Sequence, residues 1–202
     1  MRSMDATTDY AAARVDRRRL ALPNGWWGAA LFIATEATLF GTLIATYYYL
    51  RFNAPQWPPA GVEHPKVALP LILTAILVAT TVPIFFAVRA ARAGSARLAW
   101  LLFLVAVVVQ AGYLGVQVHE FLSDLDKFSP HDTAYASIYF TMIGAHHAHV
   151  VVGIAIELWV LWKLLGGLTN YRMIGVRVAA LYWYFVNFAA VAVVLTQVYP
   201  SL

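Results

Sequence analysis

The sequence has 202 residues, of which 61% are hydrophobic and only 12% are charged, a balance that water-soluble domains rarely show. Its formal net charge is +4, but the arginines form short clusters between apolar stretches instead of one basic face, which argues against nucleic-acid binding. The absence of cysteine excludes disulfides, thiolate nucleophiles and Cys-ligated metal centres.

The chain begins with an arginine-rich polar segment, residues 1–24, which we expect to be cytoplasmic. The apolar stretch that follows has the full length of a membrane span and lacks the short apolar region and cleavage site of a signal peptide. We therefore expect no cleaved leader.

Five apolar stretches follow, each long enough to cross a hydrocarbon core of about 30 Å as a helix of roughly 20 residues. They run approximately over 25–50, 67–90, 98–122, 134–165 and 176–199. We therefore predict an all-α fold, an integral membrane bundle of five transmembrane helices within residues 25–202. Pro83 is expected to kink the second span, because proline cannot donate to the carbonyl four residues back.

The distribution of basic residues predicts the orientation of the bundle. Because successive spans cross the membrane in opposite directions, eleven Lys and Arg residues fall on one side of the membrane and three on the other, which accounts for all fourteen. The three are Arg51, Lys66 and Lys127. Since basic loops stay in the cytoplasm, we expect the N-terminus inside and the C-terminus outside.

Glu36 lies about a dozen residues into the first span, near the predicted midplane. An ionisable group at that depth is costly and tends to be paired or functional. Two interpretations carry equal weight: a proton relay, or a hydrogen-bonded group that fixes helix packing.

The fourth span carries three histidines, His146, His147 and His149. Helical periodicity places His146, His149, Gly153 and Glu157 within about 80° of one another, so one face should be polar. Because their estimated depths are similar, we expect Glu36 to pair with His146 or His149.

Metal ligation by this chain is disfavoured. A bis-histidine haem needs one histidine from each of two helices at the same depth, and His119 misses the depth of His146 by roughly 12 Å. We expect packing roles for these histidines and no cofactor in this chain.

We expect the polar residues near the span ends to have structural roles. Glu120, with Gln117 and His119, should cap the outer end of the third span and contact the 124–132 loop. Glu157 is expected to pair with Arg89, Arg92 or Lys163. Arg89, Arg92 and Arg97 are candidates for anionic lipid headgroups. Several small residues suit close helix contacts: Gly41, Ala45, Ala75, Ala79, Gly112, Gly115 and Gly153.

From Trp26 to the C-terminus, the chain resembles subunit III of the haem-copper oxidases in its five-helix bacterial form. The most specific match is to the motif F-x-x-x-G-x-H-G-x-H-V-x-x-G, found here as Phe140, Gly144, His146, His149, Val150 and Gly153. Further matches are Trp27-Gly28, Leu31-Phe32-Ile33, Glu36, Leu39-Phe40, Gln117, Glu120, Phe121, Tyr182-Trp183 and Phe185-Val186. The sequence departs from the family at Tyr184 and Asn187, which replace the usual His and Asp, and at His147, which replaces a glycine.

The resemblance implies a non-catalytic subunit of a respiratory terminal oxidase in the bacterial plasma membrane, most similar to cytochrome c oxidase. Such a subunit would pack against catalytic subunit I and subunit II, which carry haem and copper. It would bind phospholipid and support proton uptake and turnover stability. The buried polar residues Glu36, Glu120, His146 and His149 would be the proton-related group.

Three alternatives remain at this point. One is subunit III of a quinol oxidase or of a nitric-oxide-reductase-type relative. Another is a self-standing transporter that uses Glu36. The third is a haem-bearing membrane anchor, which the depth of the histidines disfavours.

Overall fold

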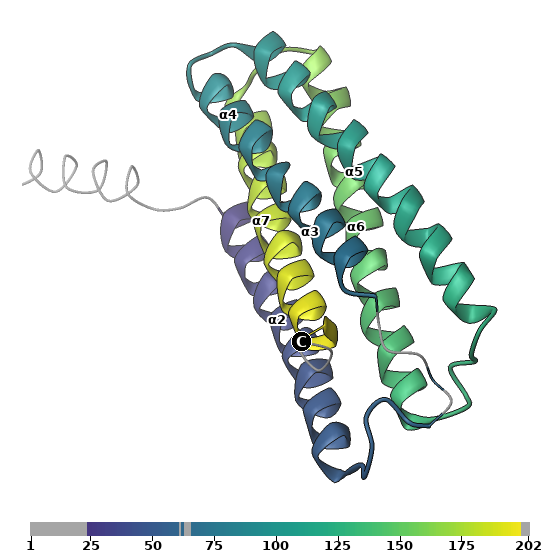
Figure 1. The fold of residues 1–202 in the computed structure, drawn as a ribbon. Coiled ribbons are helices and arrows are strands. Elements are labelled where there is room, and N and C mark those ends of the chain that lie inside the picture. Colours follow the sequence, from purple (N-terminus) through teal and green to yellow (C-terminus); the bar gives the residue numbers. More distant parts are fainter. Residues whose placement is uncertain (1–23, 61, 63–65, 199–202) are drawn as a thin grey trace, which may run out of the picture.

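The computed structural model describes residues 24–60, 62 and 66–198, and this part of the chain is helical without any strand (Figure 1). The predicted N-terminal segment, residues 1–24, lies outside the described residues except for Asn24. The helices are α2 Asn24–Asn53, α3 Ala68–Ala79, α4 Thr81–Arg92, α5 Ala96–Leu125, α6 Ala134–Leu165 and α7 Asn170–Val198.

Five helical segments are long and apolar enough to cross a membrane, with α3 and α4 together forming the second. This confirms the predicted all-α bundle of five spans. The largest difference is that α7 begins at Asn170, six residues before the predicted start at Val176. The side chain of Arg172 donates to the carbonyl of Gly167 at 2.7 Å, and Thr169 Oγ1 accepts from the amide of Arg172 at 3.2 Å. These polar contacts extend the helix beyond its apolar stretch.

The second span is interrupted where proline removes a backbone donor. α3 ends at Ala79 and α4 begins at Thr81, so the interruption falls at Thr80, three residues before Pro83. The hydroxyl of Thr80 donates to the carbonyl of Leu77 at 2.6 Å. The helix is thus interrupted within one turn of Pro83, where the kink was predicted, and the amide of Thr80 also bonds locally to the carbonyl of Leu77 at 3.0 Å.

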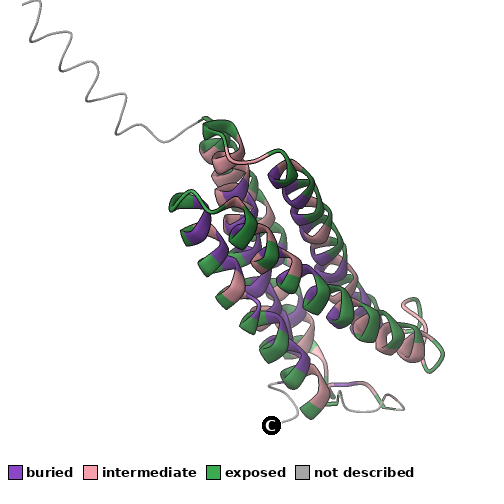
Figure 2. Cartoon of the chain, turned by 90° about the horizontal axis from the view of Figure 1, so that it is seen from above, coloured by how far each residue is buried: buried purple, intermediate pink, exposed green. Residues whose placement is uncertain are grey.

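The core lies around α7, which contacts α2, α3, α4 and α6. It is the most buried of the five spans, whereas α2 is the least buried and, among the described helices, packs on α6 and α7 alone. Figure 2 shows buried residues on the inward faces of the helices and exposed residues on their outward faces. Large apolar side chains point outward, Phe52 and Phe188 among them.

Among the glycines predicted to suit close helix contacts, Gly153 makes one within the chain. A Cβ built on Gly153 would lie 2.8 Å from Cζ2 of Trp183, so only glycine lets α7 approach α6 here. At Gly41, Gly112 and Gly115 a Cβ would meet nothing within 4 Å. These three glycines make no close contact with another helix of the described chain, and their contact with a partner helix stays a prediction.

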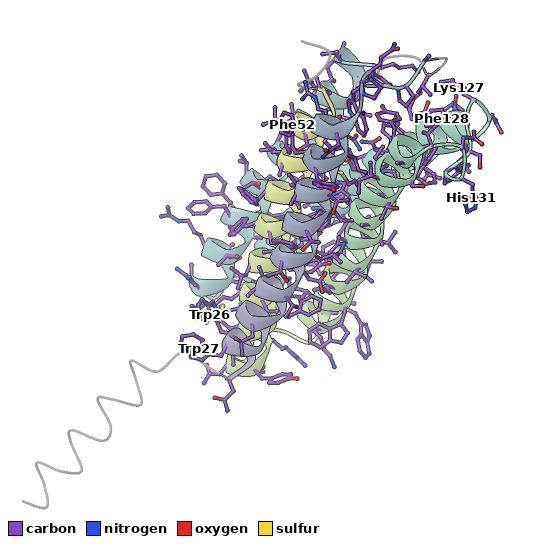
Figure 3. The ribbon with its side chains drawn as sticks, turned by 90° about the horizontal axis from the view of Figure 1, so that it is seen from below. Trp26, Trp27, Phe52, Lys127, Phe128 and His131 are labelled. Atoms are coloured by element: carbon purple, nitrogen blue, oxygen red, sulfur yellow. The ribbon has the colours of Figure 1, made fainter. Side chains whose placement is uncertain are left out.

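The two ends of the bundle are chemically distinct. Figure 3 places Trp26 and Trp27 at one end, called the Trp26 end below. It places Phe52, Lys127 and His131 at the other, called the Lys127 end. The connections α4–α5 and α6–α7 lie at the Trp26 end, where Gly94 and Gly167 adopt φ of 83° and 80°.

Candidate functional site

The candidate site is built on α6, which carries most of the buried polar side chains. The helix begins where the sequence predicts, because Thr133 caps it by accepting the amide of Ala136 at 3.0 Å. Its neighbours are α2, α5 and α7, so side chains that leave α6 in different directions meet different helices.

Glu36 of α2 and His149 of α6 are in direct contact. His149 Nε2 lies 2.8 Å from Glu36 Oε2, and its Nδ1 lies 2.7 Å from the carbonyl oxygen of Ala145. A carbonyl only accepts, so Nδ1 carries a proton and the tautomer is set. One further proton then lies between Nε2 and the carboxyl oxygen, and the pair is neutral overall whichever atom holds it. This neutrality makes a carboxyl group tolerable inside the span.

Aromatic rings and a backbone contact hold the pair in place. The ring of Phe40 lies 4.9 Å from that of His149, and the ring of Phe185 lies 6.2 Å away. The hydroxyl of Tyr182 donates to the carbonyl of His149 at 3.3 Å. The side chains of His149 and Glu36 retain exposures of 13% and 21%, so the pair lies at the edge of the bundle and not at its centre.

His146 turns away from Glu36 and joins a second network. Its Nε2 lies 3.2 Å from the hydroxyl of Tyr113, which accepts from Gln117 Nε2 at 3.0 Å. His147 is also buried, with its ring 5.6 Å from that of Phe121. The histidines of the predicted polar face therefore do not share a partner: His149 meets α2 while His146 meets α5.

The polar groups near the Lys127 end are paired. Glu120 Oε2 accepts from Lys66 Nζ at 2.9 Å, so its partner comes from the α2–α3 connection instead of the 124–132 loop. Asp124 accepts from Lys127 at 2.9 Å and from the hydroxyl of Tyr139 at 2.8 Å. The cap predicted at Glu120 therefore has a different partner, Lys66, which lies just before α3.

Glu157 forms no ion pair with any residue that the structure describes. It is fully buried, and neither carboxyl oxygen has a hydrogen-bond partner among the described residues. The amide of Gln110 lies beside it. The expected partners lie elsewhere: Lys163 Nζ lies 4.5 Å from the centre of the Trp162 ring, and Arg89 lies over Phe85. The pairing prediction was wrong because Glu157 faces the core while these cations face outward.

The last helix departs from the family motif at Tyr184 and Asn187, and these two residues have different surroundings. Asn187 is buried and donates from Nδ2 to Thr81 Oγ1 at 2.8 Å, which ties α7 to the first turn of α4. Tyr184 lies on the exposed side of α7. A neutral amide at position 187 therefore forms a hydrogen bond between two helices.

The arginines proposed for lipid contact share one end. Arg89, Arg92 and Arg97 are exposed around the α4–α5 connection at the Trp26 end. Over the described part of the chain, no group of three or more His, Asp or Glu side chains is arranged to hold a metal ion.

Sequence reasoning missed Tyr113, Thr81 and Lys66 as partners of the polar residues it singled out. Tyr113 precedes Gln117 by one helical turn, a spacing that places both on one face and could have linked them. Thr81 and Lys66 are far from their partners in sequence, and only the packing of helices brings them together.

The chemical capacity of the candidate site lies in the contact between Glu36 and His149, which can hold one proton.

Comparisons with known proteins cover nearly all of the chain. The profile of the family described as cytochrome c oxidase subunit III matches residues 17–199. A cytochrome c oxidase subunit 3 from Thermostichus vulcanus is 31% identical over 162 residues, covering 79% of this chain and 79% of the relative. One from Bacillus sp. (strain PS3) is 29% identical over 185 residues, covering 88% and 86%. A quinol oxidase subunit 3 from Bacillus spizizenii is 28% identical over 168 residues, covering 81% and 79%.

Proposed function

The chain belongs to the cytochrome c oxidase subunit III family, and we propose that it serves as the non-catalytic subunit III of a respiratory haem-copper terminal oxidase. The observation that carries this proposal is the family match over residues 17–199, which extends across all five spans. Haem and copper would reside in its partners, catalytic subunit I and subunit II.

Cytochrome c is the proposed electron source of the complex. The relatives from Thermostichus vulcanus and Bacillus sp. (strain PS3) are cytochrome c oxidase subunits. The name of the Bacillus spizizenii relative supports a quinol-oxidising complex as the second candidate. The donor would bind to the other subunits in either case, so this chain's own role is the same.

The Glu36–His149 pair is the proposed proton-related group of this subunit. It holds a proton within a membrane span and keeps some exposure at the edge of the bundle. These properties suit a role beside the proton-uptake path of a neighbouring subunit. Glu120 and His146, which take part in separate contacts, are proposed to support the packing of α5 and α6.

The proposed setting is the bacterial plasma membrane, with the Trp26 end in the cytoplasm. The excess of Lys and Arg at that end supports this orientation. Residues 1–24 would then be cytoplasmic and residues 25–202 would form the membrane domain. Arg89, Arg92 and Arg97 are exposed where anionic phospholipid headgroups would lie.

Gentle detergent purification of the affinity-tagged chain from its native membrane tests the assignment. We expect larger subunits to co-purify in stoichiometric amounts, together with a haem absorption spectrum and oxygen-consuming activity. Reduced cytochrome c and a quinol, supplied separately, identify the donor. The chain expressed without its partners should be colourless and serves as the control. A colourless preparation from the native membrane, lacking partner subunits, would contradict the proposal.

A further inference from the structure

Glu157 of α6 is a carboxyl group that is closed off from solvent. The residue has no exposed surface, and neither carboxyl oxygen has a hydrogen-bond partner among the described residues. Because the protein encloses both oxygens, bulk water does not solvate them. A polar group in this position is costly unless its charge or its hydrogen bonds are compensated inside the protein.

No described cation compensates a negative charge on Glu157. The ion pairs of the described chain involve other carboxyl groups, and Lys163 and Arg89 lie over aromatic rings. A lone carboxylate moved from water into an apolar interior loses so much hydration free energy that the group becomes neutral instead, by binding a proton. Charge alone therefore favours a protonated carboxyl at this position.

Gln110 of α5 is the neighbour that can use such a proton. The helices α5 and α6 pack side by side, and the amide of Gln110 lies beside the carboxyl of Glu157 (Figure 1). Gln110 is fully buried as well, and its Oε1 has no hydrogen-bond partner among the described residues. Two enclosed groups with unused oxygens thus meet between these helices.

Thr80 fixes the direction of the Gln110 amide. The hydroxyl of Thr80 donates its proton to the carbonyl of Leu77 at 2.6 Å, so its oxygen is left to accept. Gln110 Nε2 lies 3.5 Å from that oxygen and supplies the donor. An amide nitrogen carries two protons, so Nε2 keeps one for Glu157, and Oε1 remains an acceptor.

The inventory of donors and acceptors distinguishes the two charge states of Glu157. An ionised carboxyl group can only accept, and so can Gln110 Oε1, so the ionised state leaves the amide oxygen without a donor. A protonated carboxyl group has one O–H donor and one carbonyl acceptor, which match the oxygen and the second N–H of the amide. A single added proton therefore gives both side chains a partner.

We propose that Glu157 is a proton-binding site in the core, where a neutral carboxylic acid donates to Gln110 Oε1 and accepts from Gln110 Nε2. This site goes beyond the proposed subunit function and is independent of it. At 1.5 Å per residue, Glu157 lies about 12 Å along α6 from His149, toward the Trp26 end. The helix α6 thus takes part in holding two separate protons, one with Glu36 of α2 and one with Gln110 of α5.

Infrared spectroscopy of the purified full-length chain tests the charge state of Glu157. The chain is held in micelles of an alkyl glycoside, which has no carbonyl group of its own. A carboxylic acid has a C=O stretch above the amide bands, whereas a carboxylate has separate bands at lower frequency. We expect the wild-type spectrum minus that of Glu157→Gln to show one acid band and no carboxylate bands. Carboxylate bands in place of the acid band would overturn the proposal.

Glu120→Gln is the matched control for this measurement. Glu120 is paired with Lys66 and partly exposed, so its difference spectrum should show carboxylate bands and no acid band. That result demonstrates that the two charge states are resolved in this chain. The proton held between Glu36 and His149 is present in the wild type and in both variants, so it cancels in each difference.

Gln110→Leu tests the partner, and it also serves if Glu157→Gln fails to fold, as judged by circular dichroism. Loss of the amide should shift the acid band to higher frequency, because a free C=O bond is stiffer than a hydrogen-bonded one. Gln117→Leu is the control two helical turns along α5, where the side chain bonds to Tyr113, and should leave the band in place. An acid band that is absent, or that does not move in Gln110→Leu, would overturn the proposal. The subunit assignment is judged separately by co-purification.

Discussion

The contact between Glu36 and His149 shows how a membrane span can hold a carboxyl group without a net charge. Three residues determine its geometry: Ala145 sets the tautomer, and Phe40 and Phe185 contact the imidazole ring. The sequence predicted a pair between Glu36 and one of two histidines. It could not decide which, because both candidates have similar depth and the direction of each side chain depends on where α2 and α5 pack.

A double-mutant cycle should reveal energetic coupling between Glu36 and His149. Glu36→Ala and His149→Ala each remove one side of the 2.8 Å contact, so we expect a coupling of about 1 to 2 kcal/mol in the free energy of unfolding. Unfolding is measured by titrating the purified chain in mixed micelles with a denaturing detergent. The control cycle combines Glu36→Ala with His146→Ala and should be additive within about 0.5 kcal/mol. Equal coupling in both cycles would show that the contact contributes nothing specific.

Gly153 allows the closest approach between α6 and α7. Gly153→Ala would place a methyl group 2.8 Å from the Trp183 ring, and Trp183 is fully buried, so it has little room to move. We expect a loss of about 1 to 3 kcal/mol in the same unfolding assay, typical of overpacking.

Gly112→Ala is the matched control, because nothing lies within 4 Å of a Cβ at this position on α5. It should be neutral or stabilising by up to about 1 kcal/mol, since alanine has the higher helix propensity. If Gly112→Ala were as damaging as Gly153→Ala, loss of glycine in a span, and not the Trp183 contact, would explain both.

At the scale of elements, the interruption between α3 and α4 places Thr81 at the start of α4, where its hydroxyl accepts a hydrogen bond from Asn187 of α7. Length and hydropathy predicted the spans, and Pro83 predicted the irregularity. The partner of Asn187 could not be predicted, because Thr81 is 106 residues away in sequence. The early start of α7 was missed for a different reason: its first turn is polar, and hydrogen bonds from Arg172 to Gly167 and Thr169 hold it in helical form.

Thr81→Val should weaken the contact between α4 and α7. The change keeps the shape of the side chain but leaves Asn187 Nδ2 without its acceptor at 2.8 Å, so we expect a loss of about 1 to 2 kcal/mol in unfolding free energy. Thr42→Val on the exposed face of α2 is the control, since its hydroxyl bonds to the carbonyl of Thr38 on the same helix. That change should stay within about 0.5 kcal/mol. Similar effects at both positions would contradict a specific role for the bond to Asn187.

At the scale of the whole molecule, helix burial is uneven. α7 is enclosed by four other helices, while α2 buries only Phe40 and Tyr47. The outward face of α2 carries large apolar side chains, including Leu31 and Tyr49. An apolar surface of this kind suits lipid or a partner helix, as the proposed assembly with an oxidase requires.

Single cysteines should report the orientation without background, because the natural sequence contains none. Ser95→Cys lies in the α4–α5 connection and Ala60→Cys in the α2–α3 connection, and both positions are exposed. A membrane-impermeant maleimide should label Ala60→Cys in right-side-out vesicles and Ser95→Cys only in inverted ones, as the excess of basic residues at the Trp26 end predicts. The opposite pattern would reverse the proposed topology.

The sequence alone determined the five spans, the irregularity near Pro83 and the family resemblance. These features depend on local properties: the length of apolar stretches, the missing donor of proline and the spacing of motif residues. Only the tertiary structure decided that Glu36 meets His149, that His146 meets Tyr113 and that Glu157 is buried in the core. The physical reason is that a helix can turn about its axis without changing its depth. Packing against its neighbours sets that rotation and thereby selects the partner of each buried polar side chain.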